Sequence, residues 1–486
     1  MKAYERLYIG GEWIAPSTAA TIDVISPHTE EVVGRVPEAR EADVDRAVAA
    51  ARAAFDTGPW PRMTPAERAD VMARLLAALQ ARAEEMATTI TTEMGSPISW
   101  SVMGQVMAAH MVLDYFVRLA REYTFEEVRP GMLGPALVRR EPVGVAAAII
   151  PWNVPLFTTL LKLGPALAAG ATIVVKPAPE TPLDAILLAD ALTEAGVPKG
   201  VVNIVPAGRE VGEHLVKHPG IDKVGFTGST AAGRRVAALC GERLKRVTLE
   251  LGGKSAAVIL DDADLAETVA GLLPAAIMNN GQACVAQTRI LASRRRYDDV
   301  VSALAEAFRA VPVGDPMDPS TMCGPLVAAR QRDRVEGYIA AGKAEGARVA
   351  CGGGRPKGLA KGWYVEPTVF AGVTNQMKIA REEIFGPVIA VIPYDDVDDA
   401  VRIANDSDYG LSGSVWSADV ARGLDVARRV RTGTYTVNGF AMEFSAPFGG
   451  FKSSGVGREL GPEGLAAYLE TKTINLPMGY DPKLVG

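Results

Sequence analysis

The stretch that decides the fold of this 486-residue chain is Gly144-Val145-Ala146-Ala147-Ala148-Ile149-Ile150, which is followed by Pro155–Ala169. An uninterrupted apolar run of this kind is typical of a strand that is buried on both faces, as strands of parallel sheets are. Pro155–Ala169 has the pattern of a helix, and Gly170 provides its expected end. A buried strand that leads at once into a helix predicts a parallel α/β sheet.

The same alternation continues along the chain to about Leu251. Further strands are predicted at Ala171–Val175, Val201–Val205, Lys223–Thr227 and Arg246–Leu251. The predicted helices between them are one with Thr181 as its N-cap that runs to Gly196, Arg209–Lys217, and one from about Ala231. This pattern of strands, helices and short loops indicates a doubly wound, Rossmann-like domain.

A second alternation, after Cys284, predicts a second α/β domain. Its expected elements are Arg289–Ala292, a helix from about Tyr297, Pro387–Tyr394, Val397–Asn405, Ser412–Trp416, a helix to Val430, and Thr434–Val437. The first 140 residues differ from both domains, because a strand-and-turn segment at Leu7–Trp13 is followed by Ala-rich helices at Glu41–Phe55 and Pro65–Met94.

Composition and charge narrow the class of protein. With 48% hydrophobic and 22% charged residues, the chain is expected to be a globular protein of two or three domains. A net charge of -6 provides no basic surface for nucleic acid or acidic membranes, so a small-molecule ligand is expected. The four cysteines form no CxxC pair, and the N-terminus lacks the plan of a signal peptide, so we expect a reducing, cytoplasmic location.

Cys284 is the candidate nucleophile, within the stretch Met278–Thr288. A thiolate is the strongest side-chain nucleophile, and the small residues Gly281 and Ala283 would let a substrate and backbone N–H groups approach it. A lone cysteine is more often a small buried hydrophobic residue, so this interpretation depends on the motifs that accompany it.

A glycine-rich segment, Gly225–Gly233, is the candidate phosphate-binding turn, because it lies where a strand passes into a helix. Backbone N–H groups and hydroxyls at a helix N-terminus bind pyrophosphate. Arg234-Arg235 stands where a P-loop would have Lys-Ser/Thr, and the GxGxxG fingerprint is missing. On its own the segment is equally compatible with an ordinary strand-helix turn.

Polar side chains follow other predicted strands, where ligands bind in such sheets. Asn153, in Pro151-Trp152-Asn153, offers an amide donor, and Glu250 is followed by two glycines. Glu383 and Phe448 lie in later loops. The four histidines lie beside none of these motifs, and the sequence holds neither GxSxG nor a metal-ligand cluster, so a Cys-His, Ser-His or metal mechanism is disfavoured.

Taken in order, five motifs resemble the aldehyde dehydrogenase superfamily, and the resemblance extends from Tyr8–Trp13 to Thr471–Thr473. They are Pro151-Trp152-Asn153, Phe226-Thr227-Gly228-Ser229, Glu250-Leu251-Gly252-Gly253-Lys254, Gly281-Gln282-Ala283-Cys284 and Glu382-Glu383-Ile384-Phe385-Gly386-Pro387. The resemblance implies oxidation of an aldehyde to the carboxylic acid with NAD. Because a thiol must first make the carbonyl carbon tetrahedral before hydride can leave, the residue types suit this chemistry.

The resemblance also implies the role of each site residue. Cys284 would attack the aldehyde, Asn153 and the Cys284 N–H would hold the oxyanion, Glu250 would activate water, and Lys162 would be a further catalytic residue. The implied cofactor contacts are Trp152, Lys176, Pro179, Gly228, Ser229, Leu251, Gly252, Glu383 and Phe385. The implied substrate contacts are Val154, Leu161, Met278, Ala283, Val285 and Phe448.

The implied architecture has a cofactor domain (1–121 and 141–252), a catalytic domain (253–452) and a small β oligomerisation module (122–140 and 453–486). This module would have two exposed edge strands, Leu137–Arg140 and Thr471–Leu476, that a partner subunit covers, so a homotetramer or homodimer is expected. Pro179 stands where many NAD-preferring members have a glutamate, so NADP is expected to be accepted measurably.

The same residues bear on two alternatives to hydrolytic oxidation, a CoA-acylating enzyme and a non-catalytic protein of the same fold. A CoA-acylating relative typically lacks the water-activating glutamate, and this chain has Glu250. A non-catalytic protein of the same fold could lose the nucleophile, and this chain keeps Cys284.

Overall fold

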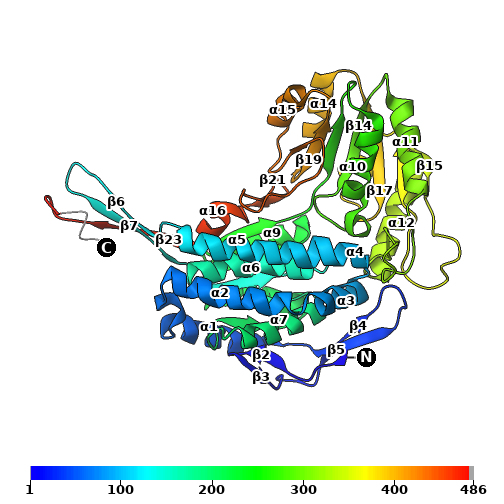
Figure 1. The fold of residues 1–486 in the computed structure, drawn as a ribbon. Helices are drawn as coiled ribbons and strands as arrows, with labels where there is room; N and C mark the ends of the chain where they lie inside the picture. Colours follow the sequence, from blue (N-terminus) through cyan, green and yellow to red (C-terminus); the bar gives the residue numbers. More distant parts are fainter. Residues whose placement is uncertain (1, 481–486) are drawn as a thin grey trace.

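The computed structural model describes residues 2–480, so the end of the predicted 453–486 segment lies outside the described residues. An eight-stranded sheet forms the centre of the first domain (Figure 1). Its strands, in spatial order, are β22 (Gly455–Val456), β12 (Arg246–Glu250), β11 (Lys223–Thr227), β8 (Val145–Ile149), β9 (Thr172–Lys176), β10 (Val202–Ile204), β2 (Leu7–Ile9) and β3 (Glu12–Ile14). The strands from β12 to β10 are parallel, which confirms the predicted doubly wound sheet.

Helices cover both faces of this sheet, because side chains of β8 alternate between two cores. Ala146 and Ala148 belong to one core and Val145 and Ala147 to the other. The first core includes α2 (Pro65–Gln80), α3 (Ala83–Met94), α5 (Ala108–Glu122), α6 (Pro155–Ala169) and α7 (Leu183–Glu194). The second includes α1 (Glu41–Asp56), α8 (Arg209–Lys217) and α9 (Thr230–Gly241).

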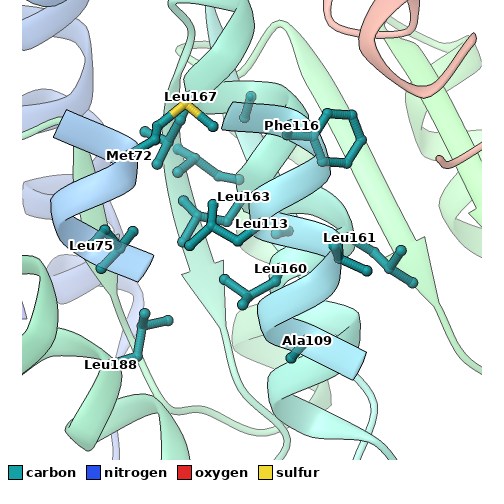
Figure 2. Packing of buried hydrophobic residues seen from close by; sticks show 14 of the residues in the cluster. Met72, Leu75, Ala109, Leu113, Phe116, Leu160, Leu161, Leu163, Leu167 and Leu188 are labelled. Atoms are coloured by element: carbon teal, nitrogen blue, oxygen red, sulfur yellow. The ribbon is translucent and has the colours of Figure 1, made fainter. Parts of the chain in front are cut away.

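The largest core positions α6, the helix that carries Leu161 and Lys162. Figure 2 shows side chains of α2, α5 and α6 packed together, among them Leu75, Leu113 and Leu160. Gly164 allows α5 and α6 to approach closely, since a Cβ atom there would lie 2.7 Å from Cδ2 of Phe116. Leu161 belongs to this core and also lines a cavity beside Cys284.

The second domain contains a seven-stranded sheet (Figure 1). Its strands, in spatial order, are β15 (Arg348–Cys351), β16 (Thr368–Ala371), β17 (Val388–Tyr394), β14 (Gln287–Ser293), β13 (Ser255–Ile259), β19 (Gly413–Trp416) and β20 (Thr436–Val437). Helices α10 (Leu265–Ile277) and α11 (Tyr297–Arg309) pack on one face, and α12 (Ala329–Ala344), α14 (Val397–Asn405) and α15 (Val420–Arg429) on the other. The predicted second α/β domain is therefore present.

A three-stranded sheet of β23 (Leu469–Asn475), β7 (Ala136–Pro142) and β6 (Glu126–Arg129) projects from the first domain, at the left of Figure 1. Its central strand is β7, which pairs with β6 on one side and β23 on the other. The prediction that both Leu137–Arg140 and Thr471–Leu476 are edge strands is therefore wrong for the first of them. The exposed edges belong to β6 and β23.

Two predicted helix boundaries are also wrong. Pro65–Met94 forms two helices, α2 and α3, with a break at Ala81 and Arg82. The helix predicted from Thr181 begins at Leu183, and a carboxylate from another helix caps it instead: Glu93 accepts hydrogen bonds from the N–H groups of Leu183 (2.8 Å) and Asp184 (3.2 Å). An N-terminus can be satisfied by any acceptor that tertiary structure brings to it.

The remaining elements are short. They are β1 (Lys2–Ala3), β4 (Thr21–Ile25), β5 (Val32–Pro37), η1 (Trp60–Arg62), α4 (Ile98–Trp100), the π-helix η2 (Ser101–Met107), η3 (Met278–Gly281), α13 (Lys378–Arg381), β18 (Tyr409–Gly410), β21 (Phe451–Lys452) and α16 (Gly461–Ala466). Residues 143–161, which carry no charged side chain, form β8, a turn and the first turns of α6. Within residues 2–480, every helix is too short or too polar to cross a membrane.

Candidate active site

The strand order of the first sheet reverses between β8 and β11, which are neighbours in space although β9 and β10 separate them in sequence. Ligands bind in doubly wound sheets at such a point, beyond the carboxyl ends of the strands. The residues that follow β8 and β11 include Trp152 and Asn153 after the first, and Gly228 and Ser229 after the second. Two of the predicted motifs therefore meet at one crevice.

The loop that carries Cys284 has an unusual backbone. Asn279 (φ 53°), Asn280 (φ 62°) and Gly281 (φ 73°) are all left-handed, a conformation that asparagine and glycine tolerate best. A side chain at position 281 is excluded, because a Cβ atom there would lie 2.2 Å from the carbonyl carbon of Gly386. The loop is thus packed directly against the second domain's Glu382–Pro387 motif.

Buried amide side chains hold this loop in place. Asn280 donates from Nδ2 to the carbonyl groups of Gly95 and Pro325, both at 2.8 Å, and its Oδ1 accepts from the Gly324 N–H at 2.6 Å. Gln282 accepts from the Val327 N–H at 3.1 Å. The position of Cys284 is therefore fixed by contacts with segments distant in sequence, a role that the sequence alone did not reveal for these amides.

Two cavities meet at Cys284. The first, which we call the crevice, is lined by the predicted site residues that follow β8, β11 and β12. The second, which we call the inner chamber, has a volume of about 160 Å³. Both are lined by Cys284, Asn153, Val154, Thr227 and Glu250. The three residues predicted to carry out the chemistry therefore lie at the junction of two cavities.

The inner chamber has an almost wholly apolar wall. All six predicted substrate contacts line it: Val154, Leu161, Met278, Ala283, Val285 and Phe448. A larger set of wall residues was not predicted from the sequence: Trp100, Gly104, Ala108, Phe157, Thr158, Phe440, Met442 and Phe444. These come from the N-terminal helices, from α6 and from the loop before Phe448, and they belong to no recognised motif.

The crevice combines backbone, aromatic and charged groups. It is lined by seven of the predicted cofactor contacts: Trp152, Gly228, Ser229, Leu251, Gly252, Glu383 and Phe385. The ring of Trp152 packs edge-on to that of Phe385. Glu383 accepts a hydrogen bond from the Gly253 N–H at 2.9 Å, and burial raises the pKa of its carboxyl group to about 7. Gln331 and Arg334 of α12 also line the crevice and were not predicted.

A third cavity, the outer pocket, lies beside Ser229 between α8 and α9 and has a volume of about 490 Å³. Lys176 and Pro179, the remaining predicted cofactor contacts, line it. The Lys176 ammonium donates to the carbonyl groups of Pro177 (2.6 Å) and Ala207 (2.9 Å), and burial lowers the pKa of Lys176 to about 8. Ser229 is the N-cap of α9, and its hydroxyl accepts from the Ala232 N–H.

The Cys284 thiol is partly exposed to its cavity but screened from bulk water. Burial first, and then the carboxylates Glu383 and Glu250, raise the pKa of Cys284 to about 12, while the N–H groups of Cys284 and Val285 act in the opposite direction. Asn153 donates from Nδ2 to the Gln282 carbonyl at 2.8 Å, so the loop and the amide are joined directly. The resting sulfur is therefore held mainly as the thiol.

Glu250 lies beside a buried ion pair. The ammonium of Lys162 donates to Glu459 Oε1 (2.7 Å) and to Thr227 Oγ1 (2.6 Å), and all these groups are buried or half-buried. Burial, with Glu459 as a second cause, raises the pKa of Glu250 well above its usual value, and Lys162 acts against this shift. Lys162 was predicted as a site residue, whereas Glu459 was missed.

The fold and the site are those of a nicotinamide-dependent oxidoreductase, with a cysteine at the junction of two cavities. The chain belongs to the aldehyde dehydrogenase family, whose sequence model matches residues 13–474. Oxidation of an aldehyde to the acid is the activity that this membership and the named relatives support, as the sequence resemblance implied.

Individual relatives match nearly the whole chain. Geranial dehydrogenase of Castellaniella defragrans is 49% identical over 476 residues, 97% of this chain and 99% of that protein. A Mycobacterium tuberculosis aldehyde dehydrogenase complexed with NAD+ is 52% identical, with a TM-score of 0.98 over 99% of both chains. A mutant of aldehyde dehydrogenase C from Pseudomonas syringae with NAD+ and octanal is 44% identical, with a TM-score of 0.94 over 97% of this chain and 96% of that one.

Proposed function

We propose that this protein oxidises apolar aldehydes with NAD+, through a thioester on Cys284 that water hydrolyses. The observation that carries the proposal is the shared wall: Cys284, Asn153 and Glu250 line both the crevice and the inner chamber. An apolar substrate is favoured because hydrophobic and aromatic side chains form nearly all of that chamber. The relatives named for geranial and crystallised with octanal act on or bind aldehydes of this kind.

The crevice and the outer pocket suit a dinucleotide. The first N–H groups of α9, the Ser229 hydroxyl and the Lys176 ammonium are donors for phosphate and ribose oxygens, and Glu383 is an acceptor for ribose hydroxyls. The similar chains complexed with NAD+ support this assignment. Bound NAD+ would accept the hydride that the substrate carbon releases.

In the first half of the reaction, Cys284 Sγ releases its proton to solvent and forms a bond to the aldehyde carbon, a step that does not require Glu250. The carbonyl oxygen becomes an alkoxide, which the Cys284 N–H and Asn153 Nδ2 stabilise. Such oxyanion donors each contribute about 3 kcal/mol to stabilising a transition state. Loss of hydride from the carbon leaves a thioester on Cys284.

In the second half, Glu250 removes a proton from water, which attacks the thioester carbon and releases the acid and the thiol. The pair of Lys162 and Glu459 is placed to take the proton onward, since both groups interact electrostatically with Glu250 and Glu459 lines the inner chamber beside it. Because burial keeps the Glu250 carboxyl protonated at low pH, deacylation should accelerate as pH rises through its raised pKa.

Replacing Glu459 with glutamine tests this coupling. The change removes a negative charge that raises the Glu250 pKa and leaves Lys162, which lowers it, so the Glu250 pKa should fall. We expect the acid limb of the deacylation rate to move to lower pH. Single-turnover kinetics across a pH series measure this limb. Glu463→Gln, at an exposed position nearby, is the control, and an unmoved or raised limb in Glu459→Gln contradicts the coupling.

Cofactor preference should depend on Pro179. Proline lacks a charge that would repel a 2′-phosphate, and the outer pocket that it lines also contains Arg209. We therefore propose that NADP is accepted beside NAD. Pro179→Glu should lower kcat/KM for NADP at least about 10-fold relative to NAD through like-charge repulsion. Pro179→Gln, which adds similar bulk without charge, should spare NADP, and equal losses for both cofactors in Pro179→Glu would place ribose recognition elsewhere.

The domain roles follow from the same assignment. We propose that 1–121 and 141–252 bind the cofactor, that 253–452 supply the nucleophile, and that 122–140 with 453–486 mediate assembly into a homotetramer or homodimer in the cytoplasm. The open edges of β6 and β23 support assembly, because unpaired strand edges are usually covered.

The proposed function is tested with the purified protein and a panel of aldehydes, by following absorbance of the reduced cofactor. Linear alkanals and terpenoid aldehydes should be oxidised, and semialdehydes with a terminal carboxylate should be poor substrates, since the inner chamber has no cationic wall residue. A protein that turns over none of them, or only the carboxylated ones, does not have the proposed function.

A further inference from the structure

The inner chamber adjoins a second cavity. A cavity of about 590 Å³, which we call the vestibule, lies along α10 and Trp416. The vestibule and the inner chamber share three wall residues, Trp100, Met278 and Phe440. The wall that separates the two spaces is therefore one side chain thick, and it is built from residues of three distant segments.

The inner chamber alone is small. Its volume is about 160 Å³, close to that of an apolar cavity of roughly 150 Å³ that holds one benzene molecule. An alkyl chain much longer than a single ring therefore has to leave the chamber. The vestibule is the larger space on the other side of the shared wall, and its own lining is more polar, with Asp264, Thr268 and Asn438 among its residues.

Trp100 is held in this wall by a glycine. It ends α4, directly before η2, and a Cβ atom at Gly104 would lie 2.5 to 2.7 Å from the indole atoms Cε2, Cζ2 and Cδ2. The indole thus lies against the backbone of η2, in a seat that any side chain at position 104 would fill. A π-helical turn such as η2 widens the helix locally and is frequent at functional sites.

Hydrogen bonding does not explain the position of Trp100. Its Nε1 is buried and has no hydrogen-bond partner among the described residues. A buried N–H without a partner costs about 1–3 kcal/mol. The indole therefore forms part of the wall although its N–H group is left without a hydrogen bond.

We infer that Trp100, seated on Gly104, is a specificity-determining partition that limits how far an aldehyde chain extends from Cys284. This inference rests on the proposed function, because it assumes that the substrate occupies the inner chamber. Short alkanals fit on the Cys284 side of the indole. Longer chains pass the indole and place their distal carbons in the vestibule, so the partition reduces the gain from each added methylene.

The test is the dependence of kcat/KM on chain length for linear alkanals from butanal to dodecanal. In the wild type, each methylene should raise kcat/KM about 3- to 4-fold until the chamber is filled, and less thereafter. Trp100→Ala joins the two spaces, so the ratio of kcat/KM for dodecanal to that for butanal should rise at least about 10-fold. Trp100→Phe, a smaller partition, should give an intermediate ratio.

Two further variants separate a partition from a general structural role. Gly104→Ala fills the seat and displaces the indole, so it should alter the length profile while Trp100 is present. Met103→Ala is the matched control, because Met103 lies on the same π-helix, is 56% exposed and lines neither space. A wild-type profile in Trp100→Ala, or the same change in Met103→Ala, would overturn the inference.

A binding measurement distinguishes failure of this inference from failure of the proposed function. Linear primary amides have the same chains and no hydride to transfer, so their dissociation constants report length selectivity without turnover. If no alkanal is oxidised but amide affinities change between the wild type and Trp100→Ala as above, the partition stands and the proposed activity fails. If alkanals are oxidised but Trp100→Ala changes neither the chain-length dependence of kcat/KM nor that of the amide dissociation constants, the partition is refuted and the proposed activity stands.

Discussion

Cys284→Ala should reduce aldehyde oxidation by at least about 10⁴-fold, the scale on which loss of a covalent nucleophile acts. Asn153 and Glu250 would remain in place, but without sulfur the substrate carbon would not become tetrahedral and hydride would not leave. Because the dinucleotide groups belong to the crevice and the outer pocket, binding of NAD+ should persist in this variant. Steady-state turnover and the thermal shift produced by NAD+ measure the two properties separately.

The other three cysteines are the matched controls for this prediction. Cys240, Cys323 and Cys351 are buried, and none of them lines the crevice, the inner chamber or the outer pocket. Replacing each with alanine should preserve activity. Iodoacetamide should modify Cys284 first, at a rate that keeps rising toward high pH, since its pKa is raised to about 12. Substantial turnover in Cys284→Ala would exclude the thioester mechanism.

Much of the catalytic centre could be predicted because the motifs lie at ends of strands. The apolar run at Gly144–Ile150 indicates a parallel sheet, and in such a sheet the carboxyl ends of β8, β11 and β12 meet at one edge. Asn153, Ser229 and Glu250 each follow or end one of these strands, so their proximity is a consequence of topology.

The rest of the site depends on tertiary contacts that leave no local pattern. Trp100 and Phe440 lie far from each other and from Cys284 in sequence. Neither belongs to a motif that distinguishes it from an ordinary core or loop residue. Glu459 is separated from its partner Lys162 by 297 residues, and no spacing rule joins them. Their pairing requires the C-terminal segment to return to the first sheet, where β22 pairs with β12.

The wrong helix start at Thr181 has a similar cause. Thr181-Pro182 has the sequence of an N-cap followed by proline, but Glu93 from α3 accepts hydrogen bonds from the first N–H groups of α7 instead. The capping preference of Thr is about 1 kcal/mol, which a buried carboxylate in good geometry can override.

Glu250→Gln should separate the two halves of the reaction. Glutamine keeps the size of the side chain but cannot accept a proton from water, so acylation should proceed and hydrolysis should stop. We expect a burst of about one reduced cofactor per active site, followed by steady turnover lowered about 10²- to 10⁴-fold. Rapid mixing with an aldehyde and NAD+ measures both phases.

The trapped species can be identified directly. The stalled protein should gain the mass of the aldehyde less two hydrogen atoms, on the peptide that contains Cys284, because the thioester retains the acyl group after hydride has left. The double change Cys284→Ala with Glu250→Gln is the control and should show neither burst nor added mass. Unimpaired steady turnover in Glu250→Gln would exclude Glu250 as the base.

Rescue distinguishes a lost base from a distorted site. Hydroxylamine is a neutral nucleophile at pH 7 that attacks thioesters without a general base, so it should restore turnover in Glu250→Gln and release the hydroxamic acid. The same reagent should leave Cys284→Ala inactive, since no thioester forms there. If hydroxylamine fails to restore turnover although the added mass is present, then the variant has closed access to the thioester, and the buried position of Glu250 between the crevice and the inner chamber would be its main contribution.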